Sequence, residues 1–135
     1  MANNKECAVD VTLRVIGGRW KSVILYHLHD KTVRFGELQR LIPGITQKML
    51  AQQLKELEHH GVVSRKVYAQ VPPRVDYSLT KFGMTLCPIL RAMAKWGSDH
   101  REKIGAKRSW ELRSDNDPAR SRKIMEVKFP IVSNN

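Results

Sequence analysis

Hydrophobic residues in the first part of the chain recur at helical spacing and are separated by short turn signals. They predict a mostly buried helix over residues 20–29, followed by a short helix that Pro43-Gly44 ends. The apolar positions of these two helices are Trp20, Val23, Ile24, Leu25, Leu28, Phe35, Leu38 and Leu41. Residues 7–16 precede them and are ambiguous, because their apolar residues alternate as in a strand but also suit one side of a helix.

Residues 46–60 carry the clearest amphipathic pattern in the chain. Thr46 is a favoured N-cap type, and Gly61 suits the position that follows a helix. At the helical rotation per residue, one side is apolar and the other is polar or small. The apolar side consists of Met49, Leu50, Leu54 and Leu57, and the opposite side of Lys48, Ala51, Gln52 and Lys55.

After Gly61 the hydrophobic period changes to two. Residues 63–68 and 74–79 both alternate, and Val71-Pro72-Pro73 lies between them, so a two-stranded hairpin with a proline-rich tip is predicted. A last helix is predicted from Thr80, which is again a favoured N-cap type. A kink or break is predicted at Pro88, which lacks a backbone donor. Its apolar stripe consists of Phe82, Leu86, Ile89, Leu90, Met93 and Trp96.

This order of elements predicts a winged helix-turn-helix, a mainly α fold with a small β-hairpin. We assign residues 7–104 to this domain. Residues 105–135 are more polar and are interrupted at 114–118, so they read as a basic C-terminal extension. The extension can hold one extra helix starting near Asp117, add a dimer or DNA contact, or be partly disordered.

Charge narrows the choice of partner. The chain carries 24 basic and 13 acidic side chains, a net charge of +11, and residues 1–100 alone are net +7 (15 basic, 8 acidic). A basic globular part favours a polyanionic partner such as nucleic acid, with a solubilising surface as the alternative. The chain has no membrane-length apolar run, no secretory leader and only two cysteines, so we expect a cytoplasmic protein.

The sequence argues against an enzyme. It contains none of the motifs G-x-x-x-x-G-K-[ST], G-x-G-x-x-G, G-x-S-x-G or H-E-x-x-H. Its histidines and cysteines do not have zinc-site spacing, so we expect no metal and no cofactor.

The polar side of the 46–60 helix suits the major groove of DNA. Glutamine can pair with adenine, lysine with guanine acceptors, and the helix start can hold a phosphate. The DNA-binding candidates are Arg34, Thr46, Gln47, Lys48, Gln52 and Lys55, with Lys66 and Arg74 in the hairpin. The alternative is a solvated helix face beside a hairpin whose charges only protect its edges.

Four motifs occur in a specific order. Residues 7–21 read CAVDVTLRVIGGRWK, and residues 34–44 read RFGELQRLIPG. Residues 45–61 read ITQKMLAQQLKELEHHG, and residues 71–83 read VPPRVDYSLTKFG, which fits V-P-P-[KR]-V-[ED]-Y-x-L-T-x-x-G. Over residues 7–97 the chain resembles the HxlR-type winged-helix transcriptional regulators of bacteria.

The resemblance implies that residues 7–16 are helical, that 46–60 is the recognition helix and that 63–79 is the wing. It also implies a homodimer paired through the first and last helices, and a two-fold dimer can read two half-sites one DNA turn apart. The dimerisation candidates are Val9, Leu13, Leu86, Ile89, Leu90, Met93 and Trp96. Without the resemblance, the stripe of the last helix would be read mostly as core.

Cys7 is the candidate sensor of a small electrophile or oxidant, as in similar family members. A helix start and the nearby Lys5 favour the thiolate, whereas Glu6 opposes it. Ala8 stands where the family usually has proline, and a small buried apolar role is the alternative. For Cys87 we expect packing in the core or the dimer.

We therefore expect a dimeric, sequence-specific regulator that binds a double-stranded DNA operator. Simple occlusion of a promoter and family tendency favour a repressor. One alternative is a winged-helix protein-docking module with only nonspecific nucleic-acid affinity. A second is RNA binding, which would want more exposed aromatic rings than Tyr68 and Tyr77 on the hairpin.

Overall fold

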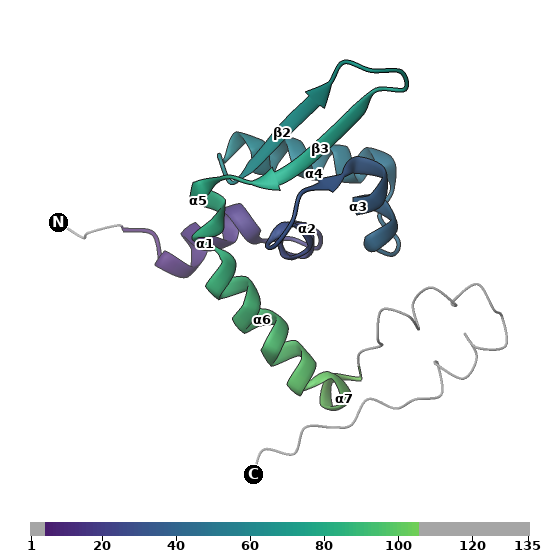
Figure 1. The fold of residues 1–135 in the computed structure, drawn as a ribbon. Coiled ribbons are helices and arrows are strands. Elements are labelled where there is room, and N and C mark those ends of the chain that lie inside the picture. The colour runs from purple at the N-terminus through teal and green to yellow at the C-terminus, as the bar shows by residue number, and fades with distance from the viewer. Residues whose placement is uncertain (1–4, 106–135) are drawn as a thin grey trace, which may run out of the picture. The chain divides into compact units, whose positions relative to one another are not determined.

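The structure is a computed structural model that describes residues 5–105 of the 135-residue chain. The described residues divide into two units, residues 5–91 and residues 92–105. In chain order (Figure 1), the first unit holds α1 (Ala8–Ile16), α2 (Lys21–Leu28), β1 (Val33–Arg34), α3 (Phe35–Leu41), α4 (Gln47–His59), β2 (Val63–Tyr68), β3 (Arg74–Leu79) and α5 (Lys81–Met84). Helix α6 (Cys87–Asp99) begins in the first unit and continues into the second, which also holds α7 (Arg101–Ile104). The expected extension at 105–135 lies outside the described residues, apart from Gly105.

The predicted fold class is confirmed, because α3, a turn and α4 are followed by a hairpin of β2 and β3. The sequence missed β1, whose two residues are too few to show a period. The sheet is antiparallel with the order β1-β3-β2, so the second hairpin strand is central. In Figure 1, α4 lies along the hairpin.

Residues 8–16 form helix α1, as the resemblance implied and against their strand-like alternation. Ile16 is the one buried residue of α1, whereas Val9 and Leu13 are 63% and 50% exposed. The alternation therefore marks an apolar helix surface, and no strand face is buried there.

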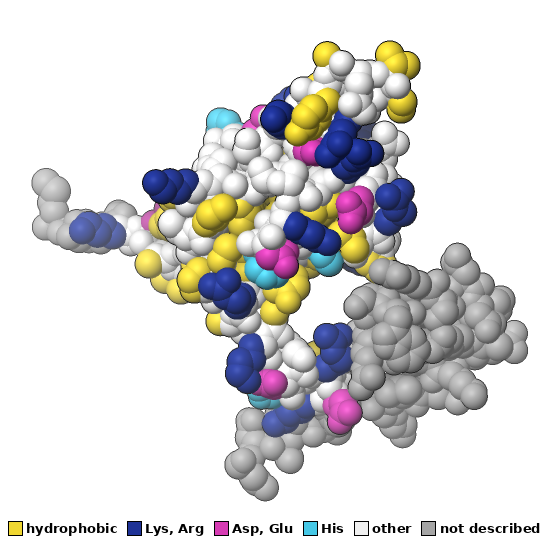
Figure 2. Space-filling view, viewed as in Figure 1, with side chains coloured by type: hydrophobic (Ala, Val, Ile, Leu, Met, Phe, Trp, Pro, Cys, Tyr) yellow, Lys and Arg dark blue, Asp and Glu magenta, His cyan; other side chains and the backbone are white. Residues whose placement is uncertain are grey.

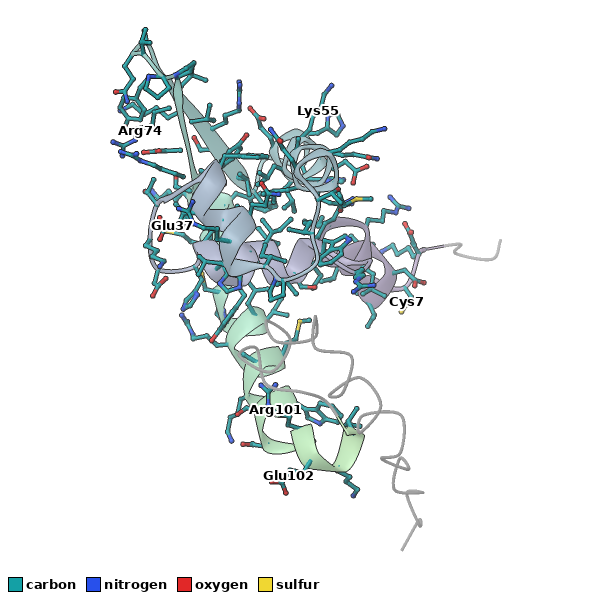
Figure 3. All side chains as sticks on the ribbon, turned by 90° about the vertical axis from the view of Figure 1, so that its right-hand side faces the viewer. Cys7, Glu37, Lys55, Arg74, Arg101 and Glu102 are labelled. Carbon is teal, nitrogen blue, oxygen red and sulfur yellow. The ribbon has the colours of Figure 1, made fainter. Side chains whose placement is uncertain are left out.

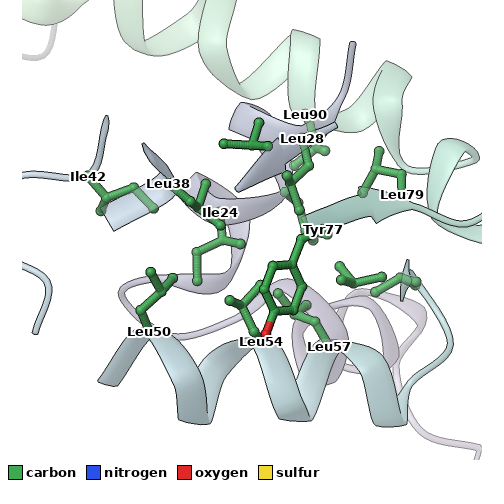
Figure 4. Packing of buried hydrophobic residues seen from close by; sticks show 14 of the residues in the cluster. Ile24, Leu28, Leu38, Ile42, Leu50, Leu54, Leu57, Tyr77, Leu79 and Leu90 are labelled. Carbon is green, nitrogen blue, oxygen red and sulfur yellow. The ribbon is translucent and has the colours of Figure 1, made fainter. Parts of the chain in front are cut away.

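The core of the first unit is built on the apolar side of α4. Leu50, Leu54 and Leu57 are at most 1% exposed. Figure 4 shows them facing buried side chains of α2, α3, β3 and the start of α6, namely Ile24, Leu28, Leu38, Tyr77, Leu79 and Leu90. Burial of each leucine is worth about 1.5–3 kcal/mol, so the three together fix the rotation of α4 about its axis.

Thr80 joins the end of α4 to the hairpin and to α5. Its hydroxyl donates to the carbonyl oxygen of Gly61 at 2.6 Å, and its backbone N–H donates to the carbonyl oxygen of Val62 at 3.1 Å. The same hydroxyl accepts from the N–H of Gly83 at 2.9 Å, which confirms the predicted cap. Gly61 has φ +75°, a conformation that glycine adopts readily.

The single last helix predicted from Thr80 is two helices in the structure. Helix α5 ends at Met84, and α6 begins at Cys87, so the helical conformation is interrupted shortly before Pro88. Pro88 lies in the first turn of α6, where the helix needs no N–H donor from it. The predicted break is thus present, but proline starts the new helix and does not kink an old one.

Gly83 offers a test of the junction around Thr80. A Cβ at this position would lie 2.0 Å from the carbonyl oxygen of Val62, so Gly83→Ala forces the backbone apart. We expect Gly83→Ala to lower the free energy of unfolding by about 2 kcal/mol or more, measured by urea denaturation.

Gly36→Ala is the matched control, because the Cβ that alanine adds there would lie 4.0 Å from its nearest neighbour, Nη1 at the tip of Arg40. Gly36 lies within α3, so alanine there should stabilise by about 0.5–1 kcal/mol. Equal effects of the two substitutions would contradict the close approach of Gly83 to Val62.

Candidate nucleic-acid interface

Helix α4 begins with a complete N-cap. The Thr46 hydroxyl accepts a hydrogen bond from the N–H of Met49 at 3.1 Å, as the sequence predicted. The cap fixes the first turn of α4, and Thr46 itself stays exposed. The first turn contains no acidic side chain, so no carboxylate there opposes an approaching phosphate.

The outward side of α4 is exposed. Its members are Thr46, Gln47, Lys48, Ala51, Gln52 and Lys55. Among the residues that the structure describes, Lys48, Gln52 and Lys55 take part in no side-chain hydrogen bond or ion pair. On the flank of the helix, by contrast, Glu56 pairs with Lys21 of α2 at 2.9 Å. Lys48, Gln52 and Lys55 are therefore free to bind an external partner, whereas the Thr46 hydroxyl is already engaged in the helix cap.

The hairpin gathers the other basic candidates around one carboxylate. Asp76 in β3 stands in register with Arg34 of β1 on one side and Lys66 of β2 on the other. Arg74 lies two residues away on β3 and hence on the same face of the sheet. Arg34, Lys66, Arg74 and Asp76, together with Tyr68, form what we call the wing cluster.

Arg74 and Asp76 form a two-point ion pair. The Arg74 Nε donates to Asp76 Oδ1 at 3.0 Å, and Nη2 donates to Oδ2 at 2.9 Å. The Asp76 side chain is only 4% exposed, whereas that of Arg74 is 34% exposed. The hydrogen bonds from Arg74 lower the pKa of Asp76, with further lowering by the charges of Arg74, Arg34 and Lys66, so its carboxyl is ionised at neutral pH.

Tyr68 adds an aromatic face to this ion pair. The Arg74 Cζ lies 4.9 Å from the centroid of the Tyr68 ring, and the Lys66 Nζ lies 5.0 Å from it. These distances are within the range of cation–π attraction. Two basic side chains are thus held by the same ring.

Two shallow hollows adjoin these residues. One of about 340 Å³ lies between the hairpin tip and the start of α3, and Arg34, Arg74, Pro72 and Phe35 are among its lining residues. The other, about 290 Å³, is lined by Ala51, Lys55, Glu58, Arg65 and Tyr77. Tyr77 and Arg65 therefore face α4, and the alternation of a strand places Asp76 on the opposite face of the sheet.

The figures show how the basic groups are distributed. In Figure 2, basic side chains lie on both sides of an acidic one over the hairpin. In Figure 3, Lys55 on α4 and Arg74 on the hairpin lie at the upper end of the view, and Cys7 lies apart from both. The structure thus brings together the α4 candidates as one group and the candidates Arg34, Lys66 and Arg74 as another.

Sequence reasoning missed three participants in this surface. Asp76 was read only as a member of an alternating strand, Tyr68 was considered only as a stacking ring for RNA, and Arg65 was not singled out beside Lys55. A signal for Asp76 was present, since an acidic residue two positions after Arg74 lies on the same strand face. The register with Arg34 could not be seen, because β1 itself was not predicted.

The cysteines lie in different environments, and both are free thiols. Cys7 is exposed at the N-cap of α1 and caps no backbone group with its side chain. The neighbouring Glu6 is paired with Arg14, which offsets part of the negative charge beside the thiol. Cys87 is buried, with its Sγ 3.9 Å from the carbonyl oxygen of His29, so it is a core residue as expected.

Most of the dimerisation candidates have unburied apolar side chains. Those that are at least two-fifths exposed are Val9, Leu13, Ile89, Met93 and Trp96. Leu86 is half-buried against the core. Leu90 must be reassigned, because it is 2% exposed and packs inside the first unit, where no second chain can reach it.

Two features are absent from residues 5–105. They contain no group of three or more histidine, cysteine, aspartate or glutamate side chains placed to hold a metal ion. None of their helices combines the length and apolarity needed to cross a lipid bilayer.

Comparisons with known proteins match this geometry. The family described as HxlR-like helix-turn-helix matches residues 15–105. The HTH-type transcriptional regulator YybR of Bacillus subtilis is 50% identical over 113 residues, which cover 84% of this chain and 90% of that protein. The redox regulator HypR in its oxidised form is 55% identical with a TM-score of 0.66 and covers 69% of this chain and 96% of its own. Its reduced form is 52% identical with a TM-score of 0.69, covering 73% and 98%.

The Thr46 cap can be tested apart from any DNA contact. Thr46→Ala removes the acceptor for the Met49 N–H and should lower the free energy of unfolding by about 1 kcal/mol in chemical denaturation. Thr46→Ser keeps the hydroxyl and should stay within about 0.5 kcal/mol of the wild type. A Thr46→Ser loss as large as that of Thr46→Ala would contradict the capping role.

Proposed function

The chain belongs to the HxlR-like helix-turn-helix family, and we propose that it binds a double-stranded DNA operator as a homodimer. Its relatives are transcriptional regulators and not enzymes. The observation that carries this proposal is the division of α4 into a buried leucine side and an exposed side on which Lys48, Gln52 and Lys55 have no side-chain partner among the described residues. Such a helix can enter the major groove without disturbing the core.

Within the groove, each outward residue of α4 has a defined chemistry. Gln52 can donate to and accept from adenine, and Lys48 can donate to guanine acceptors. Gln47 and Thr46, at the start of the helix, are suited to a phosphate, as is Lys55 further along α4.

The wing cluster supports contact with the DNA backbone beside the major groove. Arg34, Lys66 and Arg74 place three positive groups around a single carboxylate, so the cluster keeps an excess of positive charge. Arg34 and Arg74 also line the hollow at the hairpin tip. A phosphate fits this chemistry, because guanidinium groups bind phosphate oxygens by charge-assisted hydrogen bonds.

Exposed apolar residues on α1 and α6 support a second copy of the chain as a partner. Val9 and Leu13 on α1, and Met93 and Trp96 on α6, are too exposed to be explained by the core of one chain. A two-fold dimer presents two copies of α4 to two half-sites, which one helix could not read with equal selectivity. Occupation of a promoter by such a dimer acts as repression by occlusion.

Substitutions on α4 separate base reading from phosphate contact. Gln52→Ala should lower the preference for the operator over a scrambled duplex by about 5- to 100-fold, since a base contact is lost. Lys55→Ala should weaken both duplexes similarly and reduce the salt dependence of log K by about one unit. Fluorescence anisotropy on the region upstream of the chain's own gene measures both.

Lys31→Ala is the matched control, because Lys31 is an exposed lysine outside α4 and the hairpin. It should change affinity by less than about threefold. If Lys31→Ala and Lys55→Ala weakened binding equally, affinity would come from net charge alone. Equal binding to operator and scrambled duplex by the wild-type chain would favour the protein-docking alternative.

We further propose that oxidation or alkylation of Cys7 switches the affinity for DNA. The thiol is exposed at the start of α1. The redox regulator HypR, which is 55% identical to this chain, supports a thiol switch. Helix α1 also carries proposed dimer contacts, so modification at its N-cap residue can change how two chains pair.

A thiol oxidant tests this switch. Diamide joins two thiols in a disulfide and is itself reduced, so it should link the Cys7 thiols of two chains; this should change the operator affinity of the wild type and of Cys87→Ser by about tenfold, whereas Cys7→Ser should not respond. Mass spectrometry of non-reduced proteolytic peptides should locate the modification at Cys7, because Cys87 is buried. A full response in Cys7→Ser would overturn the sensor role of this cysteine.

A further inference from the structure

Asp76 presents a contradiction on a surface proposed to bind phosphates. It is a buried carboxylate, with its side chain 4% exposed, and basic residues of three strands surround it. On charge alone it opposes the binding of DNA, because it cancels one of the three nearby positive charges. If Asp76 favours DNA binding, its contacts must offset the positive charge that it cancels.

The contacts with Asp76 and Tyr68 hold the Arg74 side chain in one orientation. Its Nε and Nη2 are held by the two Asp76 oxygens at 3.0 and 2.9 Å, and its Cζ lies 4.9 Å from the centre of the Tyr68 ring. Three contacts on one planar group restrict every torsion of this long side chain. The loss of rotamer freedom therefore occurs during folding and does not recur when DNA binds.

The ion pair still leaves Arg74 able to bind. A guanidinium has five N–H donors, and the pair with Asp76 uses two of them. Both donors of Nη1 and one of Nη2 remain, on a side chain that is 34% exposed. Adjacent donors of this kind match the oxygens of a phosphate.

We propose that Asp76 is a positioning residue, which holds Arg74 in the orientation that donates to a backbone phosphate of bound DNA. This inference rests on the proposed DNA binding and adds that the acid at the centre of the wing increases affinity. Lys66 and Arg34, in register on either side, keep the surroundings positive. The lowered pKa of Asp76 keeps its carboxyl ionised throughout the neutral range.

Neutralising the acid gives a prediction whose sign is decisive. Asp76→Asn raises the net charge by one, so charge alone would tighten DNA binding. Loss of positioning should instead weaken binding to a short mixed-sequence duplex about fivefold or more at low salt, measured by fluorescence anisotropy with the full chain. Asp76→Glu, which keeps the carboxylate, should restore binding to within about threefold of the wild type.

Two matched variants make the test specific. Glu58→Gln removes an exposed acid that has no ion pair among the described residues, so it should tighten binding. In an Arg74→Ala background, Asp76→Asn should no longer weaken binding, because no guanidinium remains to be positioned. A merely structural role for Asp76 would weaken both backgrounds equally.

Protein NMR checks the pair without DNA. The Nε–H signal of Arg74 should be protected from exchange in the wild type and lost in Asp76→Asn, while circular dichroism confirms that both chains are folded. If the wild type binds and folded Asp76→Asn binds equally or more tightly, the positioning role is overturned and the proposed function stands. If the wild-type chain binds no duplex, both proposals are overturned.

Discussion

The burial of three leucines along one side of α4 decides what the opposite side can do. Leu50, Leu54 and Leu57 fix the rotation of the helix against α2 and the sheet. Because the helix cannot roll, Lys48 and Gln52 stay on the outside. The salt bridge between Lys21 and Glu56 and the bonds of Thr80 hold the flank and the end of the same helix. Selective binding needs this rigidity more than it needs any single charge.

The outward side of α4 and the wing cluster differ in how far their basic side chains are ordered before any partner binds. On α4, Lys48, Gln52 and Lys55 have no side-chain partners among the described residues, so in the proposed complex they would become ordered only on binding, at an entropic cost. In the wing cluster, Arg74 is already ordered by Asp76 and Tyr68. In the proposed complex, Arg74 would hold a backbone phosphate and so set the register in which the side chains of α4 meet the bases.

The apolar surface and the exposed thiol connect binding with control. Val9 and Leu13 lie on the helix that begins beside Cys7, so a change at this thiol acts on a surface proposed to pair two chains. In the proposed dimer, pairing would set the separation of two α4 helices on DNA. A chemical change at Cys7 would then alter operator binding through the way in which the two chains pair.

Local patterns in the sequence determined the fold class, the outward face of α4, the hairpin and the caps at Thr46 and Thr80. Each depends on residues near one another in the chain, where period and capping chemistry are visible.

Tertiary structure alone decided the features that depend on contacts across the chain. It made α1 a helix with an exposed apolar side, added β1 to the sheet and buried Leu90 in the core. It also placed Arg34 and Lys66 on either side of Asp76, because strand register is set by pairing and by the core beneath it.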